Sequence, residues 1–343
     1  MKYLFYTTSQ SAWDGLYKAM HSAKESIYFE MYIFVDDTKQ ANDFIDLLSF
    51  KAKNGVKVKI VLDWFGSFGL SGEAQKKLRL SGAELLFFRK FFRRLHHKVV
   101  IVDETIGFLG GVNIHKSARM WDDLLVRLEG PIVNSLTGSF FRIYKLCGGK
   151  DSGESIHKRK AILGRTRIWL FEHIPYLRKP RLQHAYTEAI SGAKKRVILV
   201  TPYFTPSKWL IELLRESVDR GVKIEVMIPI KTDSAFLSRA NRRYINILKE
   251  YGVVFYLLPH MNHAKLLLVD ESLALLGSAN LDALSFDFNT EVGVFLNDEK
   301  MIADITKIVD GWKAKTVELK NPLRVYFLDR LLVVIVRLLQ PIL

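Results

Sequence analysis

Apolar residues in this chain fall into short continuous runs, separated by longer segments in which apolar residues recur every three or four positions. Runs at 27–34, 99–102 and 106–109 are rich in Val, Ile, Leu and Phe, and the segment 57–63 alternates polar with apolar residues. Runs of this length predict buried strands, and the spacing between them predicts amphipathic helices. Strands that alternate with helices indicate an α/β fold in which helices cover both faces of a sheet.

The same order of predicted elements occurs twice along the chain. In each copy a helix ends at a glycine and a strand follows, which is typical of a helix C-terminal cap. Matched positions lie about 166 to 171 residues apart throughout. The matched segments are 23–34 with 193–204, 51–63 with 217–229, 81–87 with 251–257, and 96–113 with 263–280.

This repeat divides the chain into two tandem halves. We predict an N-terminal half over residues 1–150 and a C-terminal half over 165–320, with the boundary in the glycine- and charge-containing stretch 148–164. The tail, 321–343, reads as an amphipathic helix. The pattern leaves open whether this helix lies in a membrane interface or packs on the core.

Each half contains one His-x-Lys-x4-Asp motif at the start of a predicted buried strand. The motif is specific because a turn with a fixed asparagine follows it at a fixed distance and because it occurs twice, in register with the wider repeat. In a strand, residues two apart face the same side, so each His and Lys are expected to point together. The motifs are His96, Lys98 and Asp103, and His263, Lys265 and Asp270.

The chemistry of these residues suits a phosphodiester. Lys98 and Lys265 can stabilise charge on the non-bridging oxygens, aided by the amides of Asn113 and Asn280. A neutral imidazole can attack phosphorus to give a phosphohistidine, and a second, protonated imidazole can donate to the leaving alkoxide. The ordinary histidine pKa near 6.5 lets one site hold both forms at neutral pH.

Four carboxylates and two small residues complete the predicted site. Asp103 and Asp270 end the motif strands, where they orient neighbours or balance charge; the alternative is an ordinary turn carboxylate. Asp123 and Glu291 occupy equivalent positions, and each could hydrogen-bond a motif histidine and fix its tautomer. The small residues let the turn approach the phosphate, unless tight packing alone explains them; they are Gly111 and Ser278.

The composition of the chain limits the kinds of molecule that the protein is expected to bind. The chain carries 51 Lys+Arg against 36 Asp+Glu, a formal charge of +15. Such a charge favours an anionic membrane face or nucleic acid, although it also serves solubility. The aromatic and basic run 86–95, just before His96, favours lipid contact over single-stranded nucleic acid. Cys147 is the only cysteine, which excludes an intramolecular disulfide and a cysteine-based zinc site.

The motifs resemble those of the phospholipase D superfamily. Over roughly residues 10–343 the chain is similar to the cardiolipin synthase branch of bacterial phospholipase D-type phosphatidyltransferases. Segments that carry this resemblance include Leu62-Asp63-x2-Gly66-Ser67, Thr201-Pro202-Tyr203-Phe204 and Gly277-Ser278-Ala279-Asn280-Leu281-Asp282. One departure is Leu284, where the family usually has arginine, which bears on headgroup recognition.

The resemblance implies two pseudo-symmetric α/β/α lobes with the active site at their interface. It also implies a ping-pong reaction without metal or other cofactor, in which one histidine is the nucleophile and the other the acid. We favour His96 as the nucleophile and His263 as the acid. The expected reaction makes cardiolipin or a related phospholipid from phosphatidylglycerol. Hydrolysis of phospholipids to phosphatidic acid is the alternative, and a nuclease of the same superfamily is a weaker one.

The expected location is peripheral, on the cytoplasmic face of the inner (cell) membrane, with an anionic phospholipid membrane as partner and no nucleic acid. No stretch of the sequence reaches the roughly 18 apolar residues of a spanning helix. The acceptor alcohol and the oligomeric state stay open.

Overall fold

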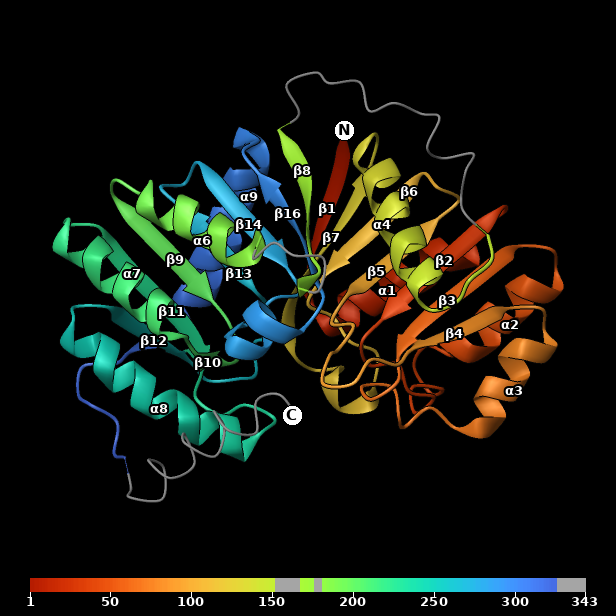
Figure 1. The fold of residues 1–343 in the computed structure, drawn as a ribbon, viewed down its shortest axis with the longest axis horizontal. Coiled ribbons are helices and arrows are strands. Elements are labelled where there is room, and N and C mark those ends of the chain that lie inside the picture. The colour runs from red at the N-terminus through yellow and green to blue at the C-terminus, as the bar shows by residue number, and fades with distance from the viewer. Residues whose placement is uncertain (152–166, 176–180, 326–343) are drawn as a thin grey trace. The chain divides into compact units, whose positions relative to one another are not determined.

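The computed structural model describes residues 1–151, 167–175 and 181–325 (Figure 1). The chain forms two compact units, Met1–Thr166 and Arg167–Leu343, and each is described below by itself. Most of the linker and of the expected C-terminal helix over 321–343 lies outside the described residues. Those two expectations and the limits of the halves therefore stay predictions.

The N-terminal unit is built on a seven-stranded sheet in the order β1-β7-β6-β5-β2-β3-β4. Strands β2, β3 and β4 run parallel to one another, and β5, β6, β7 and β1 follow β2 with antiparallel pairing at each step. The strands are β1 (Lys2–Thr8), β2 (Ser26–Met31), β3 (Lys57–Asp63), β4 (Glu84–Phe88), β5 (Lys98–Val102), β6 (Ile106–Gly110) and β7 (Asp122–Glu129).

Helices cover both faces of this sheet, as the strand pattern predicts. The apolar sides of α1 (Ser9–His21), α2 (Phe44–Lys53) and α3 (Gly72–Leu80) share one core with one face of the strands. Helix α4 (Ile132–Leu146) packs on β2, β5, β6 and β7 (Figure 1). Thr8, Asp43 and Ser71 begin the first three helices, each with a side-chain oxygen that accepts a backbone amide of the first turn.

The C-terminal unit repeats this plan with an eight-stranded sheet in the order β17-β12-β11-β9-β13-β14-β16-β8. Strands β9, β11 and β12 are parallel, and β13, β14, β16 and β8 follow β9 with antiparallel pairing. The strands are β8 (Ile168–His173), β9 (Arg196–Val200), β11 (Lys223–Pro229), β12 (Val254–Leu258), β13 (Leu266–Val269), β14 (Leu273–Gly277), β16 (Glu291–Leu296) and β17 (Val317–Glu318).

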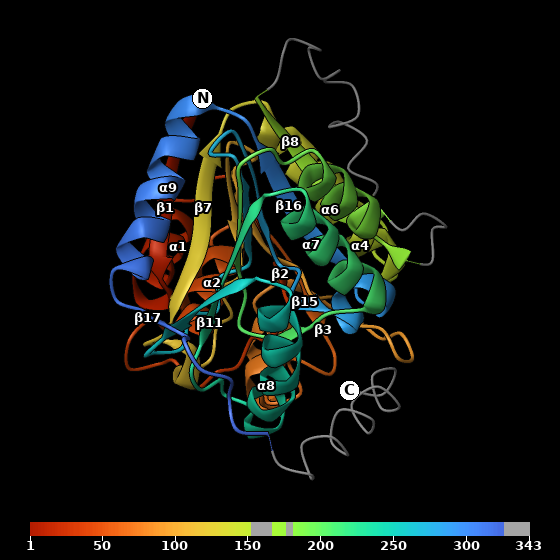
Figure 2. The ribbon, with the colours of Figure 1, turned by 90° about the vertical axis from the view of Figure 1, so that its left-hand side faces the viewer.

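Helices again lie on both faces of the second sheet. Side chains of α7 (Lys208–Asp219) and α8 (Ala235–Glu250) join α6 (Arg181–Ser191) in one core. Helix α9 (Glu299–Lys313) lies on the opposite side of the sheet from α6 and α7 (Figure 2). A short parallel pair, β10 (Phe204–Thr205) with β15 (Leu281–Asp282), and a π-helix over Leu284–Phe288 complete the unit. The predicted tandem α/β repeat is therefore confirmed.

Two charged residues at equivalent positions are buried beneath α4 in the first unit and α9 in the second. We call the sheet face that each of these helices covers the reverse face. Lys59 on β3 bonds to the Glu84 carboxylate and, at 3.0 Å, to the hydroxyl of Tyr144 on α4. Glu225 on β11 accepts hydrogen bonds from the Arg196 guanidinium and the Lys313 ammonium of α9, at 2.6 and 2.7 Å. The alternating polarity of these strands thus reflects buried ion networks and not a solvent-facing side. No helix in the described part of the chain is long and apolar enough to cross a membrane.

Candidate active site

The sheet topology brings the polar segments of each unit to one edge. Because β2 and β3 are parallel and β5 is antiparallel to β2, the carboxyl ends of β2 and β3 meet the amino end of β5. His96 precedes β5, and Asn113 follows β6, which pairs antiparallel with β5. Both therefore lie at this edge, which we call the site edge. The equivalent edge of the second sheet holds His263 and Asn280.

The His-x-Lys pair has the same local geometry in both units. His96 and Lys98 are buried, and the Lys98 Nζ donates to the His96 carbonyl oxygen at 2.8 Å. The Lys265 Nζ donates to the His263 carbonyl oxygen at 2.5 Å. Each lysine thus turns back toward the backbone of its histidine; that the two side chains share one side stays a prediction. A fixed ammonium beside an imidazole can stabilise a phosphate attacked by that imidazole.

An aromatic ring packs edge-on against each motif histidine. Tyr32 follows β2, and its ring centroid lies 4.7 Å from that of His96. In the second unit the ring of Tyr203 lies 6.3 Å from that of His263. The Lys98 ammonium also lies 4.9 Å from the centre of the Tyr32 ring. These contacts restrict the orientation of each imidazole.

The two predicted asparagines are buried at the site edges. Asn113 and Asn280 are 3% and 5% exposed, and the Oδ1 atom of each has no hydrogen-bond partner among the described residues. Their backbones are held instead: Trp13 Nε1 donates to the Asn113 carbonyl at 2.9 Å, and the Asn280 amide donates to Ser285 Oγ at 3.0 Å. A buried amide with unused capacity suits a ligand that supplies the missing partner.

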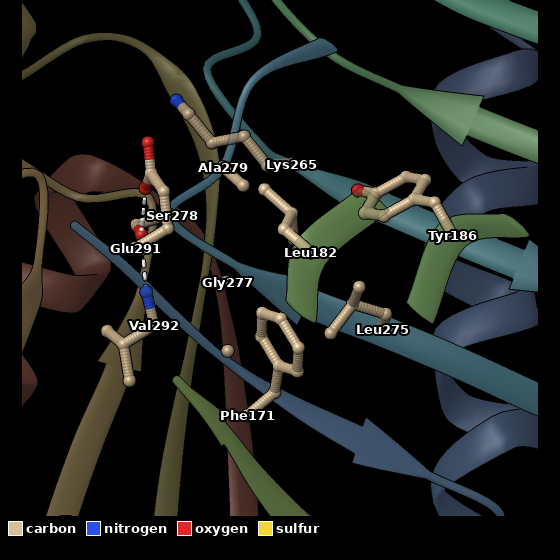
Figure 3. Close-up of a pocket in the computed structure, with 11 residues that line it drawn as sticks. Phe171, Leu182, Tyr186, Lys265, Leu275, Gly277, Ser278, Ala279, Glu291 and Val292 are labelled. Atoms are coloured by element: carbon tan, nitrogen blue, oxygen red, sulfur yellow. Dashed lines mark hydrogen bonds between the residues drawn. The ribbon is translucent and has the colours of Figure 1, made fainter. Parts of the chain in front are cut away.

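Glu291 and Ser278 interact directly in the second unit. The Ser278 Oγ donates to the Glu291 carboxylate and accepts the Val292 amide at 3.0 Å (Figure 3). The Lys265 side chain and the Glu291 carboxylate extend to the same side of the sheet and line one pocket with Ser278 (Figure 3). Glu291 thus accepts a hydrogen bond from Ser278, and a hydrogen bond to His263 stays a prediction.

The equivalent carboxylate of the first unit, Asp123, is also buried, and its Oδ1 accepts the Leu124 amide at 2.7 Å. The glycine before each small residue has a packing reason. A Cβ on Gly110 would lie 2.1 Å from the Leu124 carbonyl oxygen, and one on Gly277 would lie 2.4 Å from that of Val292. The role of Gly111 and Ser278 toward phosphate stays a prediction.

Asp103 and Asp270 do not lie with their histidines. Asp103 follows the last residue of β5, so the whole length of this five-residue strand, roughly 17 Å, lies between it and the edge that holds His96. Its carboxylate accepts the backbone amides of Lys24, Glu25 and Ser26 at 2.8–3.1 Å. Asp270 does the same for the amides of residues 194–196, all at 2.8 Å.

Both aspartates therefore act as clamps that join the motif strand to the start of its parallel neighbour. Asp103 and Asp270 adopt left-handed backbone conformations, with φ of 50° and 49°, in the turn to the next strand. Aspartate tolerates this conformation better than most residues. Our expectation that they orient groups or balance charge at the reactive edge is corrected by this geometry, and the turn-carboxylate alternative describes them.

Two further aspartates at the site edges were not among the predicted site residues. Asp63 ends β3 and accepts the amides of Gly66 and Leu95, both at 2.7 Å, so it fixes the residue before His96. Burial raises the pKa of Asp63 to about 6. In the second unit burial raises the pKa of Asp282 to about 6, and its Oδ1 accepts the Ser285 amide at 2.8 Å.

The sequence did carry a signal for both aspartates, because each belongs to a segment that supports the family resemblance. His173 was also missed: it is buried and lies opposite Glu291 in the pairing of β8 with β16. Within the described ranges, no group of three or more His, Cys, Asp or Glu side chains is arranged to hold a metal ion.

Comparison with known proteins identifies the class that this fold and these paired sites define. The family model described as "Cardiolipin synthase, PLD-like domain" matches residues 16–143 and 186–312, one match in each unit. The chain belongs to this family of enzymes, as its motifs predicted.

Curated relatives carry the same family name. The chain is 30% identical over 312 residues to a probable cardiolipin synthase of Bacillus subtilis, covering 85% of this chain and 62% of that protein. It is 31% identical over 316 residues to a cardiolipin synthase of Listeria innocua, covering 84% and 64%. The chain thus spans a little under two thirds of the length of these relatives.

Solved structures share the fold at low sequence identity. The chain is similar to the phosphatidylserine synthase of Haemophilus influenzae, with a TM-score of 0.78, 14% identity and coverage of 98% of this chain and 92% of that one. It is also similar to the polyphosphate kinase of Porphyromonas gingivalis, with a TM-score of 0.65, 14% identity and coverage of 99% and 53%. The predicted fold class, two tandem phospholipase D-like α/β/α lobes, is confirmed.

Proposed function

We propose that this protein is a phosphatidyltransferase that makes cardiolipin, or a related phospholipid, from phosphatidylglycerol through a covalent phosphohistidine. The observation that carries this proposal is the duplicated half-site: each unit places a buried His, a Lys bonded to its carbonyl and a buried Asn at one sheet edge. The cardiolipin synthase family assignment supports the substrate class.

The reaction takes two steps at one phosphorus atom. The neutral imidazole of one histidine attacks the phosphorus of phosphatidylglycerol, a nitrogen–phosphorus bond forms, and the bond to the glycerol oxygen breaks. The other histidine gives its proton to the departing glycerol. A hydroxyl of a second phosphatidylglycerol then returns a proton to that histidine and attacks phosphorus, which breaks the nitrogen–phosphorus bond and gives cardiolipin. We assign His96 as the nucleophile and His263 as the acid.

The remaining site residues stabilise charge on the phosphate oxygens and orient the two histidines. Lys98 and Lys265 stabilise the non-bridging oxygens as negative charge builds on them, and Asn113 and Asn280 supply amide donors to the same oxygens. Glu291 and Asp123 fix the histidine tautomers, directly or through neighbours such as Ser278. We propose that the protein works as a peripheral enzyme at the anionic cytoplasmic face of the cell membrane, which its charge of +15 favours.

Water as the second acceptor would make the protein a phospholipase D, because the same intermediate serves both reactions. The decisive experiment incubates purified protein with phosphatidylglycerol vesicles without added metal and resolves the products by mass spectrometry. Cardiolipin with glycerol supports the proposal, whereas phosphatidic acid alone identifies a hydrolase. Cleavage of single-stranded DNA with no lipid product would contradict the lipid assignment.

Histidine variants supply the matched controls for that experiment. His96→Ala and His263→Ala are each expected to abolish product formation. His184→Ala, at an exposed position on α6, is expected to keep it. Near-full activity in either motif variant would contradict a reaction that needs both halves.

A further inference from the structure

Five exposed aromatic residues gather in two neighbouring loops of the N-terminal unit. The loop after β3 exposes Trp64, Phe65 and Phe68 by 46%, 52% and 78%. The loop after β4 exposes Phe91 and Phe92 by 84% and 38%. We call these two loops, residues 64–70 and 89–94, the aromatic tip. Clustered large apolar side chains on a surface indicate a contact site.

The two loops form one surface because they leave adjacent parallel strands and touch each other. The Trp64 amide donates to the Phe88 carbonyl at 3.2 Å. The Arg94 guanidinium lies 4.1 Å from the centre of the Phe65 ring, and that of Arg89 lies 5.7 Å from the centre of the Trp64 ring. Cations and aromatics therefore alternate across the tip.

The outermost part of the tip is a strained turn. The Arg93 amide donates to the Lys90 carbonyl at 3.3 Å, so Phe91 and Phe92 occupy the two central positions. Phe92 has a φ of 55°, a conformation that favours glycine and is costly for a bulky residue. The turn thus holds two phenyl rings, 4.0 Å apart, at an exposed position where folding alone gives them no benefit.

We propose that the aromatic tip inserts into the interface of an anionic phospholipid bilayer and docks the N-terminal unit there. The aromatic rings enter the boundary between headgroups and acyl chains, and Arg89, Lys90, Arg93 and Arg94 bind the lipid phosphates around them. The proposal deepens the proposed function by naming the surface that brings the enzyme to its lipid.

The arrangement of the rings favours lipid over single-stranded nucleic acid. Base stacking needs an open aromatic face. The arginines lie against the rings of Trp64 and Phe65, and the two phenylalanines of the turn lie against each other. The insertion of ring edges among lipid tails needs no free face.

Asp63 couples the tip to the reactive histidine. Its carboxylate accepts the Gly66 amide from the first loop and the Leu95 amide, next to His96, from the end of the second. Ser67 Oγ further donates to the Tyr32 carbonyl at 2.9 Å, next to the ring that packs on His96. Docking of the tip would therefore hold His96 at the membrane surface.

The described loops at the equivalent place in the C-terminal unit lack this character. The segment after β11 exposes one large apolar residue, Ile230, at 49%, and the segment 259–262 contains no aromatic residue other than His260. We therefore assign docking to the N-terminal unit.

The test measures co-flotation of the full chain with vesicles of phosphatidylcholine and phosphatidylserine, which lack the proposed substrate. The double variant Phe68→Ser/Phe91→Ser is expected to weaken binding at least about tenfold. The control Phe50→Ser removes another exposed phenylalanine, 58% exposed on α2 of the same unit, and is expected to change binding by less than about twofold. Equal losses in both variants, or none in the double variant, would overturn the proposal.

A second readout separates docking from catalysis. The ratio of turnover on phosphatidylglycerol vesicles to turnover on monomeric short-chain phosphatidylglycerol should fall about tenfold in the double variant and stay constant in Phe50→Ser. If the double variant instead loses binding to oligo(dT) and keeps vesicle binding, the tip is a nucleic-acid surface and the proposal fails. Normal vesicle binding without turnover of any phosphatidylglycerol would overturn the proposed function and leave the docking surface supported.

Discussion

The two site edges of this protein have the same contacts around the motif histidine but different contacts in the segment that leads to it. In both, a tyrosine ring packs on the histidine, the lysine bonds to the histidine carbonyl, and the Oδ1 of a buried asparagine has no hydrogen-bond partner within the described ranges. Asp63 holds the segment before His96 through the Leu95 amide, but the equivalent of Asp63 in the second unit is Pro229. The segment around His263 is held locally instead, since Asn262 Oδ1 accepts the Ala264 amide at 3.0 Å.

The reverse faces differ even more. In the N-terminal unit, His97 lies 2.6 Å from the buried Glu30 carboxylate, while the equivalent positions of the second unit hold Val200 and Ala264. The duplicated position on the third strand carries a buried cation, Lys59, in one unit and a buried anion in the other. A buried charge is tolerated when groups of opposite charge surround it. The buried residue beneath the sheet can therefore be a cation in one unit and an anion in the other, while the residues at the two site edges stay the same.

The largest expected effect tests whether the two lysines are equivalent. Lys98→Met and Lys265→Met should each lower kcat/KM about 100- to 1,000-fold, or about 2.7 to 4 kcal/mol, because each removes a fixed cation from the phosphate. Steady-state assays on phosphatidylglycerol check this. Lys59→Met, equally buried on the reverse face, should lower thermal stability and leave kcat/KM nearly intact. A loss in only one motif variant would break the equivalence.

Glu225→Gln tests the reverse-face network of the second unit. It leaves Arg196, Lys223 and Lys313 without their shared anion and should cost about 3 kcal/mol, or about 6 to 12 °C in apparent Tm. The three cations lower the pKa of Glu225 to about 2. Its contribution in the wild type is therefore present above about pH 4.5 and is lost as the pH falls toward 2. An unchanged Tm at pH 7 would show that the network adds nothing.

Asp63→Asn tests the support found only in the first unit. Because the folded-state pKa of Asp63 is raised to about 6, the folded protein holds this proton more tightly than the unfolded chain. The wild type should lose stability relative to the variant as the pH rises from about 4 to about 6, by about 3 kcal/mol, and the difference should then stay constant. Thermal unfolding of both proteins across this range measures it. A constant difference would contradict a buried, proton-linked Asp63.

The smallest expected effect is at the motif aspartates. Asp103→Asn and Asp270→Asn each keep one acceptor oxygen and should cost about 1 kcal/mol, or about 2 to 4 °C in apparent Tm. With the fold intact, kcat should change less than about twofold. Loss of turnover at unchanged Tm would contradict a purely structural role and show that these aspartates contribute to catalysis.

The sequence was sufficient for the fold because both halves repeat one order of strands and helices, and two copies check each other. The spacing of His96, Lys98 and Asn113 also indicated that they lie near one another, since a short strand and a tight turn leave little freedom; their roles in the reaction stay predictions. The sequence misplaced Asp103 because a motif is read along the chain, whereas a five-residue strand carries its last residue to the opposite edge.

The sequence did not single out Asp63 as a site residue because its role depends on an amide 32 residues away. Likewise the run 86–95 is visibly aromatic and basic in the sequence, but the contribution of Trp64, Phe65 and Phe68 depends on the pairing of β3 with β4. Contacts between segments distant in sequence are what a pattern along the chain does not encode.

We propose that the two duplicated histidines have different roles in one reaction. The most direct test mixes phosphatidylglycerol labelled in its phosphate with each histidine variant, quenches with alkali and measures label bound to protein. We expect label trapped on His263→Ala, which keeps the nucleophile, and none on His96→Ala. Label on neither variant, or on both, would contradict it.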